Sequence, residues 1–227
     1  MHISEGDADC MGYEERKRQE KEIKRQDIID AAERVFFTKG YENSSMDEVA
    51  KEAEFSKRTV YVYFSSKAQI YYEIMIRGYR LLLNMLENCY SNELPQTAEE
   101  ELCSIFFTLH SFSKNHSNYF SAIMEYETKD ADAQNGIDYE LKTECYQLGE
   151  KVFGYLSKAI EKGISEGTLE SGLDSNKTAL ILWAYTVGVF NAGAKKRGYL
   201  DNYHHISVEE FVTEAFQLAM RLIIKKE

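Results

Sequence analysis

One short segment concentrates the side chains whose chemistry is easiest to interpret. Seven consecutive residues read KRTVYVY, and five of them carry hydrogen-bond donors: Lys57, Arg58, Thr59, Tyr61 and Tyr63. Ammonium, guanidinium, hydroxyl and phenol groups donate to phosphate oxygens and to the edges of bases. This density of donors in one segment, here called the recognition segment, predicts a surface that binds DNA.

Local signals around the recognition segment predict three helix starts close together. Ser45 and Glu48 have the spacing of a capping box, in which the serine oxygen accepts from one amide and the carboxylate from another. Ser66 and Gln69 repeat that spacing, and Ser56 is a third candidate N-cap. Starts this close together require short helices joined by abrupt turns.

The apolar residues give each short helix one face to bury. Val49, Ala50 and Ala53 share a face of the first helix, and Val60 and Phe64, four residues apart, form the inward stripe of the second. The cationic and aromatic side chains then fall on the other faces. This pattern is typical of a helix-turn-helix unit, whose second helix enters the major groove.

A supporting helix is predicted upstream, over residues 25–39, with Gly40 as a left-handed stop. The charged residues 14–24 before it either extend this helix or form a solvated tail. Their lysines and arginines could reach an adjacent minor groove, as arms of some DNA-binding proteins do.

Residues 26–70 resemble the N-terminal domain of the TetR (tetracycline repressor) family of one-component transcriptional regulators. The resemblance lies in IIDAAERVFFTKGYENSSMDEVAKEA, with its Phe-x-x-x-Gly-Tyr pattern, and in SKRTVYVYFSSKAQI, with Thr-Val-Tyr-x-Tyr-Phe-x-x-Lys. It implies a dimeric, mostly helical repressor that a small-molecule effector releases from a double-stranded, (pseudo)palindromic operator.

The same resemblance implies roles for particular residues. Ser45 and Lys67 would contact phosphates, and the five donors of the recognition segment would face the groove or its backbone walls. Glu54 departs from the family, which often has a glycine before the turn. A left-handed Glu54 would cost about 1–2 kcal/mol, and the alternative is a different turn geometry.

Plainer interpretations of these residues remain open. The tyrosines at 61 and 63 could simply pack on a small helix, and Lys57 and Arg58 could be a solvated charge pair. The helix caps, together with Lys67 downstream, favour DNA binding over these alternatives.

Charge is distributed unevenly along the 227 residues. Residues 14–67 hold 12 Lys/Arg and 12 Asp/Glu, while residues 68–227 carry −8 and residues 1–13 carry −3 of the total of −11. Phosphate binding depends on local charge rather than on the total. A neutral DNA-binding unit predicts modest, strongly salt-dependent affinity, so that two copies acting together are needed.

The rest of the chain predicts an all-α fold of about nine helices. We expect a flexible tail over 1–20, a helix-turn-helix domain over 21–66 and a helical ligand-binding and dimerisation domain over 67–227. Helices beyond the recognition segment are expected at 66–91, 97–114, 117–128, 137–166, 174–198 and from 207 onward. The expected N-caps are Thr97, with Glu100 in capping-box spacing, Asp174 or Ser175, and Ser207, with Glu210 in the same spacing.

The last two long helices form the predicted dimer surface. Small residues would let a partner helix approach closely, and an apolar stripe would pair with its symmetry mate to give a four-helix bundle. The residues expected there are Gly188, Ala192, Phe211, Ala215, Leu218 and Leu222. The alternative is that these stripes only close the core of one chain.

An effector pocket is expected among the middle helices. Aromatic and Met residues would line it, and polar tips would orient the ligand. The candidates are Phe106, His110, Met124, Tyr126, Tyr146 and Trp183. The alternative is that these residues are plain core.

Other classes of function have weaker support. No metal-ligand spacing, P-loop, GxGxxG or GxSxG is present, so we expect no cofactor, no metal and no enzymatic activity. A helical interaction module without DNA binding remains an alternative. The polar, acidic N-terminus, the short apolar run at 179–194 and four cysteines without CxxC spacing predict a cytoplasmic protein that does not enter membranes.

Overall fold

The computed structural model describes residues 5–92, 96–127 and 139–225. The described residues form ten α-helices and no strand, which confirms the predicted all-α fold. The chain divides into two compact units. Of the described residues, the first unit holds 5–75 and 139–143, and the second holds 76–92, 96–127 and 144–225.

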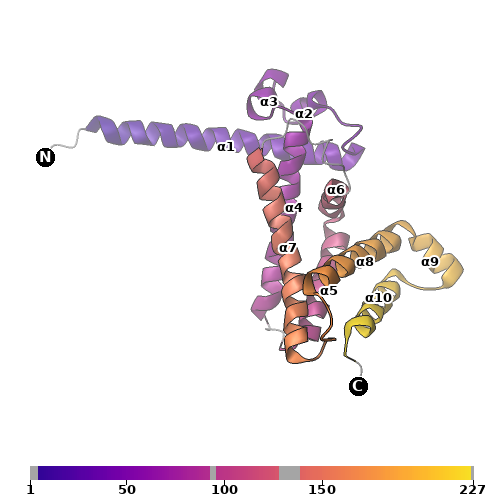
Figure 1. The fold of residues 1–227 in the computed structure, drawn as a ribbon. Coiled ribbons are helices and arrows are strands. Elements are labelled where there is room, and N and C mark those ends of the chain that lie inside the picture. The colour runs from indigo at the N-terminus through magenta and orange to yellow at the C-terminus, as the bar shows by residue number, and fades with distance from the viewer. Residues whose placement is uncertain (1–4, 93–95, 128–138, 226–227) are drawn as a thin grey trace. The chain divides into compact units, whose positions relative to one another are not determined.

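The first unit is built from four helices: α1 (Glu5–Lys39), α2 (Met46–Glu52), α3 (Lys57–Tyr63) and the start of α4 (Lys67–Asn92) (Figure 1). Each contributes fully buried apolar side chains to one small core, and these include Ile28, Val49, Val60, Phe64 and Ile70. The predicted inward stripe of the recognition segment is therefore confirmed. Gly40 follows α1 with φ +82°, so the predicted left-handed stop is also confirmed.

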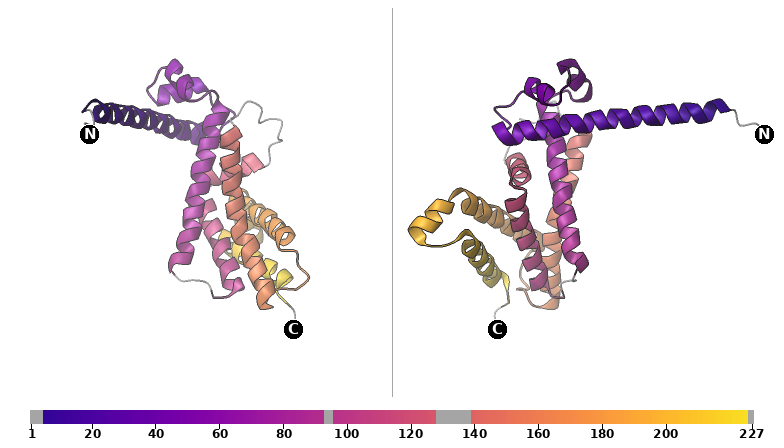
Figure 2. Two further views of the ribbon diagram at one scale, coloured as in Figure 1. Left: turned by 60° about the vertical axis from the view of Figure 1, so that its left-hand side comes forward. Right: turned by 180° about the vertical axis from the view of Figure 1, so that it is seen from behind.

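Helix α1 is longer than the predicted 25–39 and begins at Glu5, inside the segment predicted as a flexible tail. Pairs one turn apart support its first half, with Arg18 2.6 Å from Glu15 and the Gln26 amide 2.6 Å from Glu22. In Figure 2 this half extends beyond α2 and α3 as a single helix. The domain boundaries themselves stay a prediction.

The second unit contains the remainder of α4 and six further helices, of which α7 begins in the first unit. They are α5 (Ala98–Asn115), α6 (Ser117–Glu127), α7 (Tyr139–Glu166), α8 (Ser175–Lys195), α9 (Arg197–His204) and α10 (Val208–Ile223). Three predicted N-caps are confirmed: Thr97 accepts from the amide of Glu100, Asp174 from that of Lys177 and Ser207 from that of Glu210.

Among the described helices, α9 is the one that the sequence prediction of about nine missed. That prediction ended the preceding helix near residue 198. The N-cap position of α9 is Lys196, which makes no side-chain capping bond, so no capping signal marks the start. The helix ends at His204, and the C-cap residue His205 is left-handed with φ 55°.

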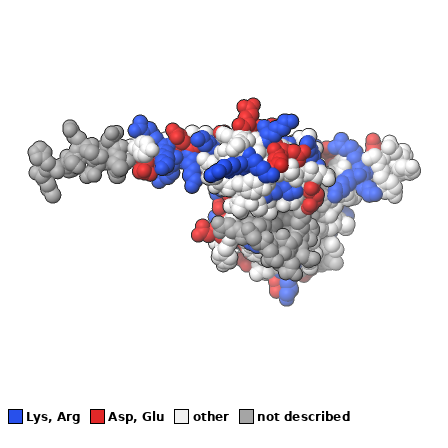
Figure 3. All heavy atoms as spheres, turned by 90° about the horizontal axis from the view of Figure 1, so that it is seen from above, with Lys and Arg blue, Asp and Glu red and all other residues white. Residues whose placement is uncertain are grey.

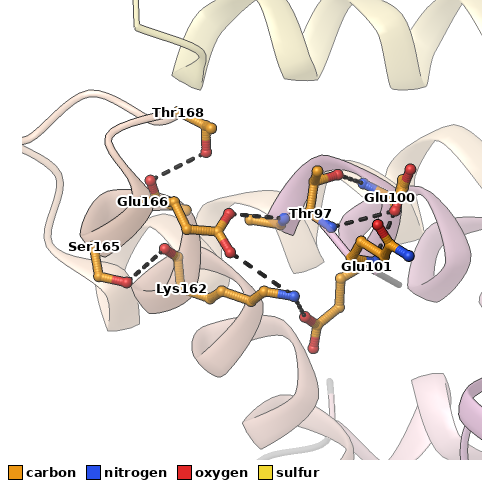
Figure 4. A network of polar contacts seen from close by, with 10 residues as sticks. Thr97, Glu100, Glu101, Lys162, Ser165, Glu166 and Thr168 are labelled. Carbon is orange, nitrogen blue, oxygen red and sulfur yellow. Dashed lines mark hydrogen bonds and ion pairs between the residues drawn. The ribbon is translucent and has the colours of Figure 1, made fainter. Parts of the chain in front are cut away.

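Polar contacts fasten the start of α5 to the end of α7 (Figure 4). The Glu166 carboxylate accepts from the amide of Ala98 at 3.1 Å, and Lys162 lies 3.3 Å from Glu101 and 4.0 Å from Glu166. The α7 helix then stops at Gly167, whose φ of +72° matches the predicted helix end. These contacts fix two of the helices that line the cavity described below.

Among the residues that the structure describes, no helix is both long and apolar enough to cross a membrane.

Candidate functional site

The turn between α2 and α3 sets the direction in which the recognition helix leaves. The amide of Phe55 donates to the carbonyl of Ala50 at 3.0 Å, and the amide of Glu54 donates to that of Lys51 at 3.2 Å. These two bonds form a Schellman motif, whose C′ residue is left-handed. Glu54 occupies that position with φ 57°, so of the two alternatives left open by the sequence the chain adopts the left-handed glutamate.

The recognition segment forms α3, as expected. Ser56 caps it by accepting from the amide of Thr59 at 3.0 Å. Val60 and Phe64 are buried in the first unit, and the Arg25 guanidinium lies 5.3 Å from the centre of the Phe64 ring. One side of this short helix is thus anchored, which leaves the opposite side available for a partner.

The outer side of α3 presents Arg58, Tyr61 and Val62. Tyr61 is 45% exposed and Val62 is 70% exposed, and Arg58 makes no hydrogen bond or ion pair within the described residues. Arg58 and Val62 are four residues apart and lie opposite the buried Val60. Val62 was not among the predicted site residues, although its spacing from Arg58 could have identified it.

The other donors of the recognition segment lie closer to the domain. Lys57 is exposed, and its ammonium is 2.6 Å from the carboxylate of Asp47, which raises the pKa of the lysine. Thr59 and Tyr63 are half-buried, and the Thr59 hydroxyl lies 2.8 Å from that of Ser56. Lys57 is therefore exposed and paired with Asp47, whereas Thr59 and Tyr63 are only partly accessible.

Ser45 lies at the exposed start of α2, inside the predicted capping box. Its oxygen accepts from the amide of Glu48 at 3.3 Å, and its own amide donates to the Glu48 carboxylate at 2.9 Å. The Lys39 ammonium lies 2.5 Å from the Glu48 carboxylate, and together with the Ser45 donors it lowers the pKa of Glu48 to about 2. The serine hydroxyl thus has partners within the chain, and a phosphate would meet the carboxylate beside it.

Lys67 points into the first unit rather than outward. Its ammonium donates to the carbonyls of Tyr41 at 2.7 Å and Ser44 at 2.8 Å, and it lies 4.2 Å from the centre of the Tyr41 ring. The loop between α1 and α2 presents these carbonyls at the start of α4, so they attract the cation. In this position Lys67 holds the loop that leads to Ser45. The family resemblance predicts a phosphate contact for Lys67, but its ammonium already donates to two carbonyls within the chain.

A small cavity lies within the second unit, lined by residues of α5, α7, α8 and α10. Its volume is about 30 Å³, which is room for one water molecule or slightly more. Thr186 supplies the polar group of an otherwise nearly apolar wall. The lining consists of Leu102, Ile105, Phe106, Leu109, Leu156, Leu182, Trp183, Thr186, Phe216, Ala219 and Met220.

The structure brings two of the six predicted ligand-binding residues, Phe106 and Trp183, to this cavity. His110 packs against Phe190 with ring centres 5.3 Å apart, and burial, followed by the nearby Lys114, lowers its pKa. Met124 is half-buried on α6, outside the cavity lining.

The last two predicted ligand-binding residues are Tyr146 and Tyr126. Tyr146 lies on α7 with 66% of its surface exposed, and it does not line the cavity. The side chain of Tyr126 lies outside the described residues.

Helices α8 and α10 carry the predicted dimer surface and are joined by a bond from the Tyr185 hydroxyl to the carbonyl of Ala215 at 3.0 Å. Leu218 and Leu222 of α10 are 53% and 74% exposed. Gly188 is exposed, and a side chain built there would meet open space. These three positions are therefore available to a partner.

The other predicted dimer residues are less accessible. Ala215 is buried within the chain, and Ala192 and Phe211 are half-buried. Two exposed apolar residues of α8, Leu180 and Ile181, were missed by the sequence prediction. Ile181 lies seven residues before Gly188, so the helical spacing contained the signal.

Comparisons with known proteins agree with this geometry. A family model described as "Bacterial regulatory proteins, tetR family" matches residues 28–74, which include α2, α3 and the turn between them.

Two curated relatives match most of the chain. The chain is 24% identical over 174 residues to the uncharacterized HTH-type transcriptional regulator YhgD of Bacillus subtilis (strain 168), covering 77% of this chain and 86% of that protein. It is 22% identical over 179 residues to the HTH-type transcriptional regulator SrpR of Pseudomonas putida, covering 78% of each.

Solved structures share the fold. The transcriptional regulator FadR from Bacillus subtilis, in complex with stearoyl-CoA, matches with a TM-score of 0.62 at 19% identity, covering 86% of this chain and 97% of that one. The relatives are named as transcriptional regulators, which confirms the prediction that the chain is not an enzyme. The family model over the DNA-binding unit, the relatives along most of the length and the shared fold together confirm the resemblance of this chain to the tetR family of bacterial regulatory proteins.

Proposed function

We propose that this protein is a cytoplasmic, dimeric repressor that binds a (pseudo)palindromic DNA operator and is released by a small-molecule effector. One observation carries the proposal: α3 is anchored by Val60 and Phe64, and its opposite side presents Arg58, Tyr61 and Val62 to solvent. A helix of this kind suits the major groove, where its side chains reach base edges.

The chemistry of the exposed side chains suggests how bases would be read. A guanidinium pairs with the O6 and N7 acceptors of guanine, and an apolar side chain contacts the methyl group of thymine. Arg58 and Val62 lie on one face and supply these two groups. Lys57 would exchange Asp47 for a phosphate at little cost, because exposed ion pairs contribute only about 0–1 kcal/mol.

Dimerisation through α8 and α10 follows from the exposed apolar residues of both helices. Ile181, Leu218 and Leu222 have no cover within the described chain. Packing two such helices against their symmetry mates buries these side chains in a four-helix bundle. A two-fold pair also gives two recognition helices, which compensates for the neutral charge of each DNA-binding unit.

The nearly apolar wall around Thr186 favours an effector that is mainly hydrocarbon. In its present state the cavity accepts about one water molecule, so an effector must bind a more open conformation. A ligand that binds this conformation more tightly shifts the population toward it. FadR binds stearoyl-CoA, which supports an acyl chain as the first effector to test. Helix α4, which like α7 contains residues of both units, is the link through which we propose the change reaches the DNA-binding unit.

Selection of duplexes from a random library by the purified full chain tests the proposal. We expect one sequence to be enriched, with Arg58→Ala weakening its binding by about 1–3 kcal/mol and relaxing preference at one base pair. Arg197→Ala, which removes an exposed arginine from α9, serves as the matched control and keeps wild-type affinity. If no sequence is enriched, or if Arg58→Ala binds with unchanged affinity and preference, the proposed DNA readout is wrong.

Effector release is tested on the enriched duplex. Stearoyl-CoA, or another acyl compound from a panel, should lower the affinity of the protein for this duplex. When the same sequence is placed within a promoter, the protein should reduce transcription until that compound is added. Trp183→Ala should alter the compound's effect while leaving DNA binding intact. An increase of transcription on binding would contradict the repressor assignment.

A further inference from the structure

Three lysines form a stripe along the first half of α1. Lys17, Lys21 and Lys24 are all exposed, and alternating steps of four and three residues place them on one face of the helix. The same alternation continues into the core-facing residues of α1, which are Ile28, Ala31 and Val35. The lysine stripe therefore extends the face by which α1 packs into the DNA-binding unit.

The lysine stripe has no acidic partner within the described residues. None of its three ammonium groups takes part in a hydrogen bond or an ion pair, whereas the neighbouring Arg18 is held by Glu15 and Arg25 is held by Glu73. Glu15 and Glu22 lie on other faces of the helix, whereas Glu14, Glu20 and Asp27 are one turn from Lys17 or Lys24 but form no ion pair with them. Three unpaired cations thus share one side of a helix.

The position of the stripe relates it to the recognition helix. Figure 3 looks onto the face that carries α2 and α3, and Lys and Arg side chains, with Asp and Glu among them, line the part of α1 that extends beyond them. From Lys17 to Lys24 the helix advances about 10 Å, at about 1.5 Å per residue. That length covers about three base pairs of a duplex, whose rise is about 3.4 Å.

We propose that the lysine stripe is a second DNA contact, which binds the phosphate backbone of the duplex outside the base pairs read by α3. This inference rests on the proposed function, because it assigns further contacts to the same complex. Phosphate contacts position a protein without reading sequence. The stripe therefore adds affinity and salt dependence, but no base preference.

Other occupants fit the stripe less well. A second copy of the same face would bring like charges together, which is destabilising. A membrane surface requires an apolar strip beside the cations, and the exposed Ile23 lies on a different face of α1. Duplex phosphates match the charge and continue from the surface of α3.

The expected effect follows from counterion release. Each phosphate that a lysine neutralises contributes about 0.9 to the slope of log K against log salt concentration. Replacing all three lysines with glutamine should lower that slope by about 1–3. At ~0.1 M salt the affinity should fall by about tenfold to several hundredfold, according to whether one or three phosphate contacts are lost.

The test compares full-length variants on the enriched duplex and on a scrambled duplex of equal length. K17Q/K21Q/K24Q should show the smaller slope, with an unchanged affinity ratio between the two duplexes. K17R/K21R/K24R keeps the charges and should keep the wild-type slope. K151Q/K158Q/K195Q removes three exposed lysines from α7 and α8 as the matched control and should also bind like wild type.

The outcomes separate this inference from the proposed function. If K17Q/K21Q/K24Q binds the enriched duplex with the wild-type slope, the inference is wrong and the proposed function stands. If its slope falls only as much as that of the matched control, the lysines act through the overall charge and the inference is again overturned. If the wild type enriches no duplex, the proposed function fails and the inference fails with it.

Discussion

At the scale of single residues, Glu54 shows which of two alternatives left open by the sequence the chain adopts. The turn between two adjacent caps requires a left-handed residue, and a glutamate adopts this conformation with φ 57°. Glycine reaches the same conformation without steric cost. The chain therefore accepts strain here to direct α3.

Replacing Glu54 should reveal this strain in the stability of the chain. Glu54→Gly relieves about 1–2 kcal/mol but loses part of the gain to the entropy of glycine in the unfolded chain, so we expect a net gain of about 0.5–1 kcal/mol. Glu54→Val should destabilise by about 1–2 kcal/mol, because a β-branched residue disfavours positive φ. Thermal unfolding followed by circular dichroism measures both changes.

A control separates the special backbone position from the general effect of glycine. Gln147→Gly, on an exposed face in the interior of α7, should lower stability by about 1 kcal/mol. A Glu54→Gly variant that unfolds as early as Gln147→Gly would show that no strain is stored at the turn.

Lys67 and Tyr146 show what residue types and spacing do not determine. The ammonium of Lys67 is held by two carbonyls of a loop more than twenty residues earlier, and no local signal encodes that contact. Tyr146 has the periodicity of a core residue but faces solvent. The direction of a side chain depends on the tertiary neighbours of its helix, which spacing along one helix cannot supply.

At the scale of helices, the capping box of α2 provides a pH-dependent contribution to stability. Lys39 and the Ser45 donors hold the pKa of Glu48 at about 2, below its ordinary value of 4.5. Because the folded pKa is lowered, the carboxylate stabilises the fold above about pH 4.5, and this contribution is lost as the pH falls toward 2.

We therefore expect Glu48→Gln to be less stable than wild type at neutral pH. The difference in melting temperature should shrink as the pH is lowered from about 5 to 2.5. Glu150→Gln, at an exposed position of α7, is the control and should follow the wild-type curve. A wild type and a Glu48→Gln variant that differ by the same amount at every pH would rule out this carboxylate as the cause.

Helix starts with a capping side chain were predictable from the sequence, and a start without one was not. Thr97, Asp174 and Ser207 cap their helices as the sequence indicated, because a hydroxyl or carboxylate bonded to a nearby amide is a local signal. Helix α9 begins at Lys196 without a capping bond and was missed. The first half of α1 was left open between helix and tail, because charged residues without an apolar stripe favour neither.

At the scale of the whole molecule, the exposed apolar residues of α8 and α10 require a partner surface. We expect the Leu218→Asp, Leu222→Asp double variant to be monomeric by sedimentation at concentrations where the wild type is dimeric. Each buried leucine contributes about 1.5–3 kcal/mol, and a dimer contains four of them, so Kd should rise by at least about a thousandfold.

The control for this variant is Ile23→Asp, which places a charge at an exposed apolar residue of α1. It should leave the dimer intact. If the leucine variant sediments as the wild type does, α8 and α10 are not the dimer surface, and another face must bring two recognition helices together.

The central claim is that a two-fold pair of recognition helices occupies successive major grooves of one duplex. Hydroxyl-radical footprinting of the full-length protein on its enriched duplex measures this directly. Two protected regions should appear, centred about 10–10.5 base pairs or about 34–36 Å apart, and with Arg58→Ala both should weaken together. A single protected region, or uniform protection without a repeat, would contradict the account.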